Sequence, residues 1–315
     1  MTADLSIQLA HNNKKGMLLS NPVMTASGTF GYGDEYSQLF DIQQLGAIVC
    51  KGTFLNPREG NPQPRLVETA SGVINSIGLQ GMGVKALIEE KAPVWAKWKV
   101  PVIVNIAGDT VEEYWKVAQA LEDVPGVSGI EVNISCPNVK NSGAAFGINA
   151  ESAAQVMRAV RTATTLPVIV KLTPIAADIA GIAREVEKAG ANAVCVANTF
   201  RGMAIDINKR KPVLANITGG LSGPAIKPLA LALVYEVAGA VNIPVIGCGG
   251  IATAADALEF IMAGASAVQV GSASFANPRA SLDVLEGIRQ FMDKERIQSL
   301  KDIIGVARAK GNSKC

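Results

Sequence analysis

The chain has 315 residues, of which 49% are hydrophobic and 18% charged, and its formal net charge is +2 at neutral pH. This length can bury a large core, and the composition is typical of a globular protein. Because the charges nearly balance, no basic field is available to hold nucleic acid or an anionic membrane, and we expect neither partner. Residues 1–16 lack the basic and then apolar layout of a signal peptide, so we expect a cytoplasmic protein.

Short runs rich in valine and isoleucine recur along the chain. They lie at residues 22–27, 47–51, 102–105, 129–133, 168–171, 194–198, 244–250 and 267–271. Between several of them, apolar residues recur with the spacing of one-sided helices, as in Ala153, Val156, Met157 and Val160. Eight such units predict an α/β fold, a TIM (β/α)8 barrel that forms one domain over residues 1–315. A doubly wound open sheet is the alternative, but no G-x-G-x-x-G follows the first run.

Two segments interrupt this alternation. Residues 54–83 and 200–223 are rich in glycine, proline and asparagine, and they follow the second and sixth predicted strands. In a barrel, such segments leave from the carboxyl ends of the strands, where active sites are built. We therefore expect a barrel with an N-terminal hairpin and with long excursions over its C-terminal face.

Polar residues end five of the apolar runs. These residues are Lys51, Asn105, Asn133, Lys171 and Asn198. A single asparagine in such a place can be a turn former, but in a barrel all five converge on one face. Because a buried lysine is costly without an anion or a polar ligand, we expect a bound species with negative charge and amide-like edges.

Glycines follow the seventh and eighth predicted strands. Gly249 and Gly250 precede a helix whose start is marked by Thr253, and Gly271 and Ser272 follow residue 270. Backbone N–H groups can approach a ligand closely at such glycines, and this is the usual phosphate site of barrels. A pair of tight turns is the alternative reading.

The cysteines and the single histidine restrict the chemistry. The five cysteines have no C-x-x-C spacing, so we expect no metal site, and the only histidine is His11 in the N-terminal segment, which disfavours Ser-His-Asp and Cys-His catalysis. Cys50 and Cys195 lie within apolar runs and are expected in the core. Cys136 lies in a loop beyond Asn133, where nearby lysines would favour its thiolate and make it a base, unless it is an inert loop thiol.

The segments "NISCPNVK", "KGTFLNPREGNPQPRLVET", "INSIGLQGMG", "NITGGLSGPAIKP" and "GCGGIATAADALEFIMAGASAVQVG" resemble class 1 dihydroorotate dehydrogenases, and the similarity covers nearly the whole chain. The resemblance implies an FMN-binding barrel that oxidises dihydroorotate to orotate in pyrimidine synthesis. It also implies that Cys136 takes the proton from C5 while a hydride leaves C6 for the flavin. General base catalysis of this kind is typically worth about 10² to 10⁴ in rate.

The resemblance also assigns binding residues. Lys51 would touch both flavin and substrate, and Lys171 would lie near the flavin pyrimidine ring as a stabilising charge. The implied substrate residues, besides Lys51, are Asn75, Ser76, Ile77, Gly78, Leu79, Asn133, Asn198 and Thr199. The implied FMN residues, besides the two lysines and Asn133, are Ser27, Gly52, Asn105, Ala197, Gly223, Gly249, Gly250, Gly271 and Ser272.

The subclass decides the electron acceptor. The forms "NITGGLSGPAIKP" and "LNPREGNPQPRLVET" are more similar to class 1B catalytic subunits, which pair with a subunit that carries FAD and a [2Fe-2S] cluster and use NAD+. The resemblance then implies a homodimer at the core of a heterotetramer. A fumarate-reducing class 1A homodimer is the alternative. From the residues alone, a Schiff-base aldolase with Lys171 or Lys51, or a barrel that only binds ligands, also stays open.

Overall fold

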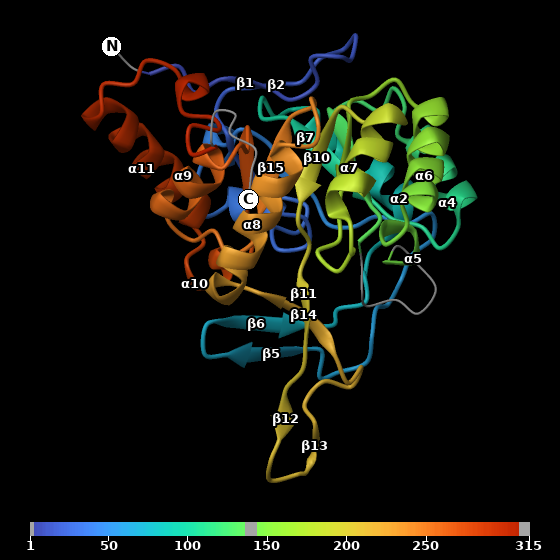
Figure 1. Cartoon of the computed structure of the whole chain (residues 1–315). Coiled ribbons are helices and arrows are strands. Elements are labelled where there is room, and N and C mark those ends of the chain that lie inside the picture. The colour runs from blue at the N-terminus through green and yellow to red at the C-terminus, as the bar shows by residue number, and fades with distance from the viewer. Residues whose placement is uncertain (1–2, 136–143, 309–315) are drawn as a thin grey trace.

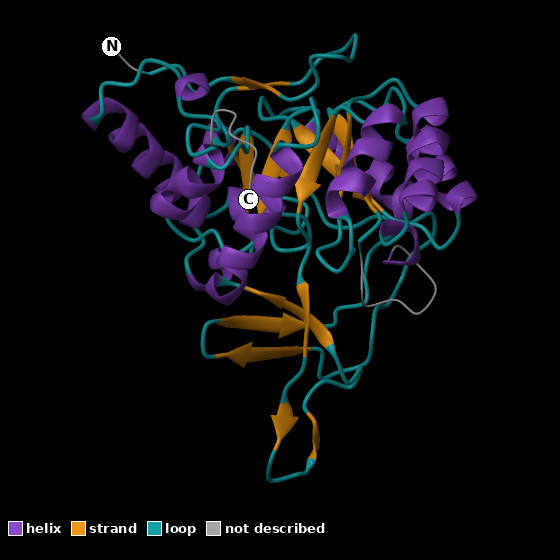
Figure 2. Cartoon of the chain, in the orientation of Figure 1, coloured by secondary structure: helices purple, strands orange, loops and turns teal. Residues whose placement is uncertain are grey.

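The computed structural model describes residues 3–135 and 144–308 (Figures 1 and 2). Its centre is an eight-stranded sheet in the order β3-β16-β15-β10-β9-β8-β7-β4, with parallel neighbours throughout. The strands are β3 (Val23–Thr25), β4 (Ile48–Val49), β7 (Val102–Ile106), β8 (Gly129–Asn133), β9 (Val168–Lys171), β10 (Ala193–Val196), β15 (Val245–Cys248) and β16 (Ala267–Val270). A parallel bridge between Met24 and Ala47 joins the first and last strands of this order. The predicted (β/α)8 barrel is confirmed.

Helices cover the outside of the barrel (Figure 2). The α-helices are α1 (Asp34–Ser37), α2 (Gly83–Ala86), α3 (Ala92–Trp95), α4 (Val111–Ala120), α5 (Ala144–Gly147), α6 (Ala150–Ala163), α7 (Ile179–Lys188), α8 (Lys227–Ala238), α9 (Ala254–Met262), α10 (Ala273–Ala276) and α11 (Ala280–Lys294). The other helical segments are the 3₁₀-helices η1 (Ile42–Gln44), η3 (Pro224–Ile226) and η4 (Leu300–Asp302) and the π-helix η2 (Leu87–Lys91). Among these, no helix has both the length and the apolar character needed to cross a bilayer.

The helix α9 shows how local sequence fixes an element. Thr253 is its N-cap, and the Thr253 and Asp256 side chains form a reciprocal capping box. Such a cap is typically worth about 1 kcal/mol. The apolar face then buries Ala257, Leu258 and Ile261 against the barrel. The sequence predicts this helix start correctly, and it places α9 directly behind the Gly249–Gly250 turn.

The N-terminal hairpin is confirmed at the opposite end of the barrel from the excursions (Figure 1). Strands β1 (Ile7–Gln8) and β2 (Leu18–Leu19) pair antiparallel. Ile7, Leu9 and Leu19 are buried in the main core cluster. The hairpin therefore extends the core beyond the amino ends of the strands and leaves the carboxyl ends to the excursions.

The two excursions are more regular than the loops that the sequence predicts. Strands β5 (Leu66–Thr69) and β6 (Gly72–Asn75) of the first excursion join β11 (Phe200–Gly202) and β14 (Gly219–Ser222) of the second in one antiparallel sheet, in the order β11-β14-β6-β5. A further hairpin, β12 (Ile205–Asp206) and β13 (Lys211–Pro212), projects beyond this sheet (Figure 1). Gly219 and Gly220 resemble a turn signal but lie within β14, where a Cβ at Gly219 would overlap the Asn75 backbone. They permit close strand approach.

Candidate active site

The polar residues that end the apolar runs all lie at the carboxyl ends of barrel strands. Asn133 and Lys171 are the last residues of β8 and β9 and face each other in the strand register. Asn105 is the next-to-last residue of β7. Lys51 and Asn198 lie two residues beyond β4 and β10. Because the strands are parallel, these side chains share one end of the barrel.

Lys171 is a buried cation with several partners. Its ammonium donates a hydrogen bond to Gln269 Oε1 at 2.9 Å, and it lies 3.8 Å from Cys248 Sγ and 3.9 Å from Glu131 Oε1. Burial disfavours the charged form, but the neighbouring Cys248 and Glu131 favour it more, so the pKa of Lys171 is raised. Lys171 therefore keeps its positive charge inside the barrel.

Two residues that the sequence analysis missed hold this region together. Glu131 is fully buried, and its two carboxylate oxygens accept hydrogen bonds from Asn105 Nδ2 at 2.7 Å and from Gln269 Nε2 at 2.6 Å. A signal was present in the run "GIEVN", because Glu131 lies two residues before Asn133 and thus on the same face of the strand. A carboxylate at a buried strand position requires partners.

The asparagines of the site form one connected chain. Asn133 Nδ2 donates to Asn105 Oδ1 at 3.3 Å, while the backbone and hydroxyl of Ser135 donate to Asn133 Oδ1 at 3.2 and 2.9 Å. Asn198 Nδ2 donates to Ser135 Oγ at 2.8 Å, and the backbone N–H of Thr199 donates to Asn198 Oδ1 at 2.7 Å. The structure therefore brings together four predicted residues, Asn105, Asn133, Asn198 and Thr199, and it adds Ser135, which the sequence analysis did not name.

Residues of the two excursions lie next to this hydrogen-bonded series of asparagines. Asn75 Nδ2 donates to the Gly220 carbonyl at 3.3 Å, and a Cβ at Gly220 would overlap the Thr199 hydroxyl. Gly220 thus lies between Asn75 and Thr199. Ser76 is fully buried, and its hydroxyl has no hydrogen-bond partner among the described residues. An unpartnered buried hydroxyl is costly, which fits a place where a ligand completes the bond.

The segment that follows has an uncommon backbone. Gly78 and Leu79 have φ values of +74° and +55°, which place both in the left-handed region. Leu79 then lies close to the barrel, since a Cβ at Gly52 would be 3.1 Å from Leu79 Cδ2 and 3.2 Å from Asn105 Oδ1. The predicted residues Gly52, Leu79 and Asn105 are therefore neighbours, and Ile77 is half-buried directly before them.

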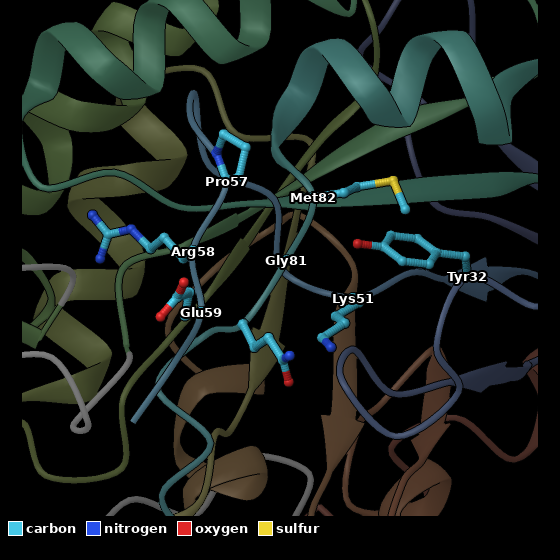
Figure 3. Close-up of a pocket in the computed structure, with 8 residues that line it drawn as sticks. Tyr32, Lys51, Pro57, Arg58, Glu59, Gly81 and Met82 are labelled. Carbon is cyan, nitrogen blue, oxygen red and sulfur yellow. The ribbon is translucent and has the colours of Figure 1, made fainter. Parts of the chain in front are cut away.

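Lys51 lies at the edge of a pocket of about 530 Å³. The pocket is lined by Lys51 together with residues that the sequence analysis did not name: Tyr32, Pro57, Arg58, Glu59, Gln80, Gly81 and Met82. Most of them belong to the first excursion, whose length and composition marked it as functional. In Figure 3 the Tyr32 hydroxyl points toward Gly81, whereas the Arg58 guanidinium points away from Lys51. Burial and the charge of Arg65 lower the pKa of Lys51.

The predicted phosphate positions lie together on neighbouring strands. Gly249 and Gly250 follow β15 with φ values of +136° and +73°. A Cβ at Gly250 would lie 2.9 Å from the carbonyl oxygen of Gly223, which itself has φ +101°. A Cβ at Gly271, after β16, would lie 3.3 Å from the Cβ of Ala26. The half-buried Ser27 directly follows Ala26, and the half-buried Ser272 directly follows Gly271.

The cysteines separate into different environments. Cys50 and Cys195 are buried as predicted, and burial raises the pKa of Cys50 to about 12. Cys248 is buried and its pKa is lowered, because the Cys195 thiol donates to it and the Lys171 ammonium is adjacent. Ala197, a predicted flavin contact, is also buried, and its N–H donates to the Cys248 carbonyl at 2.9 Å.

Cys136, the predicted base, lies outside the described residues. It directly follows Ser135, which is buried and hydrogen-bonded to Asn133 and Asn198.

The fold and the site define a class: a (β/α)8 barrel with a buried polar site at the carboxyl ends of its strands, as barrel enzymes have. The chain belongs to the dihydroorotate dehydrogenase family, whose model, described as "Dihydroorotate dehydrogenase", matches residues 9–292.

Similar proteins are close in sequence and in length. The chain is 57% identical over 287 residues to a protein of Desulforamulus reducens named "Dihydroorotate dehydrogenase B (NAD(+)), catalytic subunit", covering 91% of this chain and 94% of that protein. A protein of Pelobacter propionicus with the same name is 52% identical over 305 residues, covering 97% and 99%. The crystal structure of a dihydroorotate dehydrogenase of Eimeria tenella in complex with ferulenol has a TM-score of 0.79 at 22% identity, covering 96% of this chain and 88% of that one, which shows the shared fold.

Proposed function

We propose that this chain is the catalytic subunit of an NAD+-linked dihydroorotate dehydrogenase, which oxidises (S)-dihydroorotate to orotate in pyrimidine synthesis. The observation that carries the proposal is the near full-length identity, at 57% and 52%, to proteins with that name. The geometry of the site supports it, because Lys51, the hydrogen-bonded asparagines and the Ser76 hydroxyl, which has no partner among the described residues, suit a small anion with amide edges.

FMN is the cofactor that we propose for this single barrel, and the residues present fit it. A Cβ at Gly249 would lie 2.7 Å from Ala230 Cβ, and one at Gly250 would lie 2.7 Å from Lys227 N, so only glycine permits this close-packed turn of backbone N–H groups. Lys171 supplies a buried positive charge. FMN, when bound, supplies the hydride acceptor. The residues that would hold it are Ser27, Lys51, Gly52, Asn105, Asn133, Lys171, Ala197, Gly223, Gly249, Gly250, Gly271 and Ser272.

The chemical groups of dihydroorotate match residues from the barrel strand ends and residues from the excursions. Dihydroorotate carries one carboxylate and a ring of alternating carbonyl and N–H groups, so a lysine and several amides are the expected partners. Lys51 would meet the negative charge, while Asn133 and Asn198 would meet the ring. The excursion residues Asn75, Ser76, Ile77, Gly78 and Leu79, together with Thr199 directly before the second excursion, would close the pocket and exclude water.

Cys136 is the proposed base. Its Sγ would take the proton from C5 of dihydroorotate, and its place directly after the buried Ser135 would bring it to the asparagine chain. The lysines Lys51 and Lys171 would favour the thiolate form that this step requires.

A partner subunit completes the proposed enzyme. The words "catalytic subunit" in the names of the relatives support a second subunit. We propose that it carries FAD and a [2Fe-2S] cluster, that it passes electrons to NAD+, and that it binds a homodimer of this chain in the cytoplasm.

The test is an anaerobic visible spectrum of the purified chain before and after dihydroorotate is added. We expect a bound flavin that bleaches. A flavin spectrum that ignores dihydroorotate would reject the substrate, and a colourless chain that cannot take up FMN would reject the cofactor. Rapid reoxidation of the bleached flavin by fumarate, without a partner subunit, would reject the NAD+-linked assignment.

A further inference from the structure

Gln269 joins two opposite charges inside the barrel. Its side chain is buried, its Oε1 accepts a hydrogen bond from the Lys171 ammonium at 2.9 Å, and its Nε2 donates one to Glu131 Oε2 at 2.6 Å. Because an ammonium can only donate and a carboxylate can only accept, one orientation of the Gln269 amide satisfies both. The amide is therefore a fixed bridge between the cation and the anion.

This bridge comes from across the barrel, although the two charges are close neighbours. Glu131 and Lys171 lie on the adjacent strands β8 and β9 and on the same face of them, since Glu131 pairs with residue 169. The flexible four-carbon stem of Lys171 could reach the carboxylate directly. Instead, the ammonium lies 3.9 Å from Glu131 Oε1, beyond the range of a hydrogen bond, and bonds an amide on β16, which β10 and β15 separate from β9.

The remaining contacts keep the two charges apart. Each oxygen of Glu131 already accepts a short bond from an amide, that of Asn105 at 2.7 Å and that of Gln269 at 2.6 Å. Among the described residues, the Lys171 ammonium donates to Gln269 and to Cys248 Sγ at 3.8 Å. An ammonium has three N–H groups, so one is left for a bound group at this end of β9.

We propose that Gln269 is a positioning residue that holds the Lys171 ammonium apart from Glu131 and thereby raises the reduction potential of bound FMN. The inference rests on the proposed function and deepens it, because it assigns a regulator to the charge beside the cofactor. FMN gains negative charge on reduction, and a cation stabilises that charge more when no carboxylate in contact with it cancels its field. Without the amide, Lys171 closes on Glu131.

The experiment measures the reduction potential of FMN bound to the wild type and to Gln269→Met, by anaerobic titration with a chemical reductant and a reference dye. Methionine has nearly the length and volume of glutamine but no amide. We expect the ratio of reduced to oxidised flavin at a given potential to fall by about tenfold in the variant, which for a two-electron couple is a shift of about 30 mV.

A double-mutant cycle separates this effect from a general change of the flavin pocket. Lys171→Met removes the cation, and we expect it to lower the potential further than Gln269→Met does. When Gln269→Met is added to Lys171→Met, no further fall should appear, because no ammonium is left to position. An equal fall in both backgrounds overturns the inference, since the effect then does not pass through Lys171.

The matched control is Cys195→Ala. The Cys195 thiol lies 3.3 Å from Gln269 Oε1, so this change removes a neutral neighbour of the bridge and leaves both of its charged partners. Its potential should equal that of the wild type. If Gln269→Met does not accumulate as folded protein, Gln269→Asn retains an amide that is one methylene too short to reach both charges, and it carries the same expectation.

An unchanged potential in the folded variant also overturns the inference. The titration uses no dihydroorotate, so a failure of the proposed substrate alone does not change its result. A wild type that takes up no FMN overturns the proposed cofactor, and the inference with it.

Discussion

The two walls of the candidate site are built in different ways. The barrel wall, which comprises Asn105, Glu131, Asn133, Lys171 and Gln269, consists of buried side chains whose hydrogen bonds are largely satisfied within the protein. The excursion wall, which comprises residues 72–79 and 200–223 together with the adjoining Thr199, depends on the approach of backbones at glycines such as Gly220. The barrel wall thus fixes charge and bond direction, and the excursion wall fixes shape.

The difference predicts different costs of change. Removing one partner from a buried ion pair typically costs about 3–5 kcal/mol, because the other charge is left without compensation. Adding an atom to a well-packed contact typically costs about 1–3 kcal/mol. Substitutions in the barrel wall should therefore affect chemistry and stability most, and those in the excursion wall should mainly affect binding.

Cys136→Ala should have the largest effect on turnover, because Cys136 is the proposed base that takes the proton from C5 of dihydroorotate. We expect turnover to fall by about 10² to 10⁴ at neutral pH while bound FMN and orotate affinity are retained. Steady-state rates together with flavin absorbance check this. Cys136→Ser is the matched variant, and its activity should return only at higher pH, since a hydroxyl is a far weaker acid. Unchanged turnover in Cys136→Ala would remove it as the base.

Lys171→Met tests the barrel wall. Loss of a buried charge beside the cofactor should slow flavin reduction by about 10² to 10³, with a smaller effect on orotate affinity. Because the pKa of Lys171 is raised above its ordinary value of about 10.5, the wild-type side chain stays protonated over the whole neutral range. The rate of flavin reduction should therefore show no inflection from Lys171 between about pH 6 and 9. Stopped-flow reduction across pH measures both. Lys51→Met is the contrast and should weaken orotate binding more than reduction; the reverse ranking would contradict the assignment.

Gly220→Ala tests the excursion wall. The new Cβ would overlap the Thr199 side chain, so we expect KM to rise by about tenfold with little change in kcat, and the free energy of unfolding to fall by about 1–3 kcal/mol. Gly202→Ala is the matched control in the same sheet, because its Cβ would lie 3.4 Å from Ile74 Cδ1, an ordinary contact. Equal effects of the two substitutions on KM would show that close approach at Gly220 does not shape the pocket.

The sequence predicts the barrel wall better than the excursion wall. Apolar runs marked all eight strands, and Asn105, Asn133 and Lys171 could be named because polar residues at strand ends converge in a parallel barrel. Glu131 and Gln269 escaped because they lie inside the runs, where composition indicates core. Only its two-residue spacing from the strand end at Asn133, or the cost of a buried charge, could have identified Glu131.

The excursion sheet could not be predicted from local pattern. Its strands are short, and the pairing of β6 with β14 joins residues about 145 positions apart, such as Asn75 and Gly220. The pair Gly219 and Gly220 indicates a turn in the sequence, but in the structure it lies within β14. Glycine is needed at Gly219 because the neighbouring strand β6 approaches its backbone closely. The family resemblance, rather than any periodicity, directed attention to Asn75 and Ser76.

Glu122→Gln should have the smallest effect, at the end of the barrel away from both walls. Glu122 accepts hydrogen bonds from the hydroxyls of Thr164 and Thr165, and from the Thr165 N–H at 2.9 Å, and lies 3.5 Å from Lys15. Burial raises the pKa of Glu122, but these bonds outweigh it and lower the pKa to about 2.

Because its pKa is lowered, the Glu122 carboxylate stabilises the fold over a defined range of pH. The stabilisation is present above the ordinary pKa of 4.5 and is lost as the pH falls toward about 2, where both states bind the proton. Thermal melts should therefore show Glu122→Gln below the wild type by about 2 °C at pH 7 and converging with it near pH 2, with flavin reduction unchanged. A difference in Tm that stays constant from pH 7 to about pH 2 would show that the carboxylate charge does not stabilise this end. A slower flavin reduction would instead mean that the amino end of the barrel is coupled to the walls.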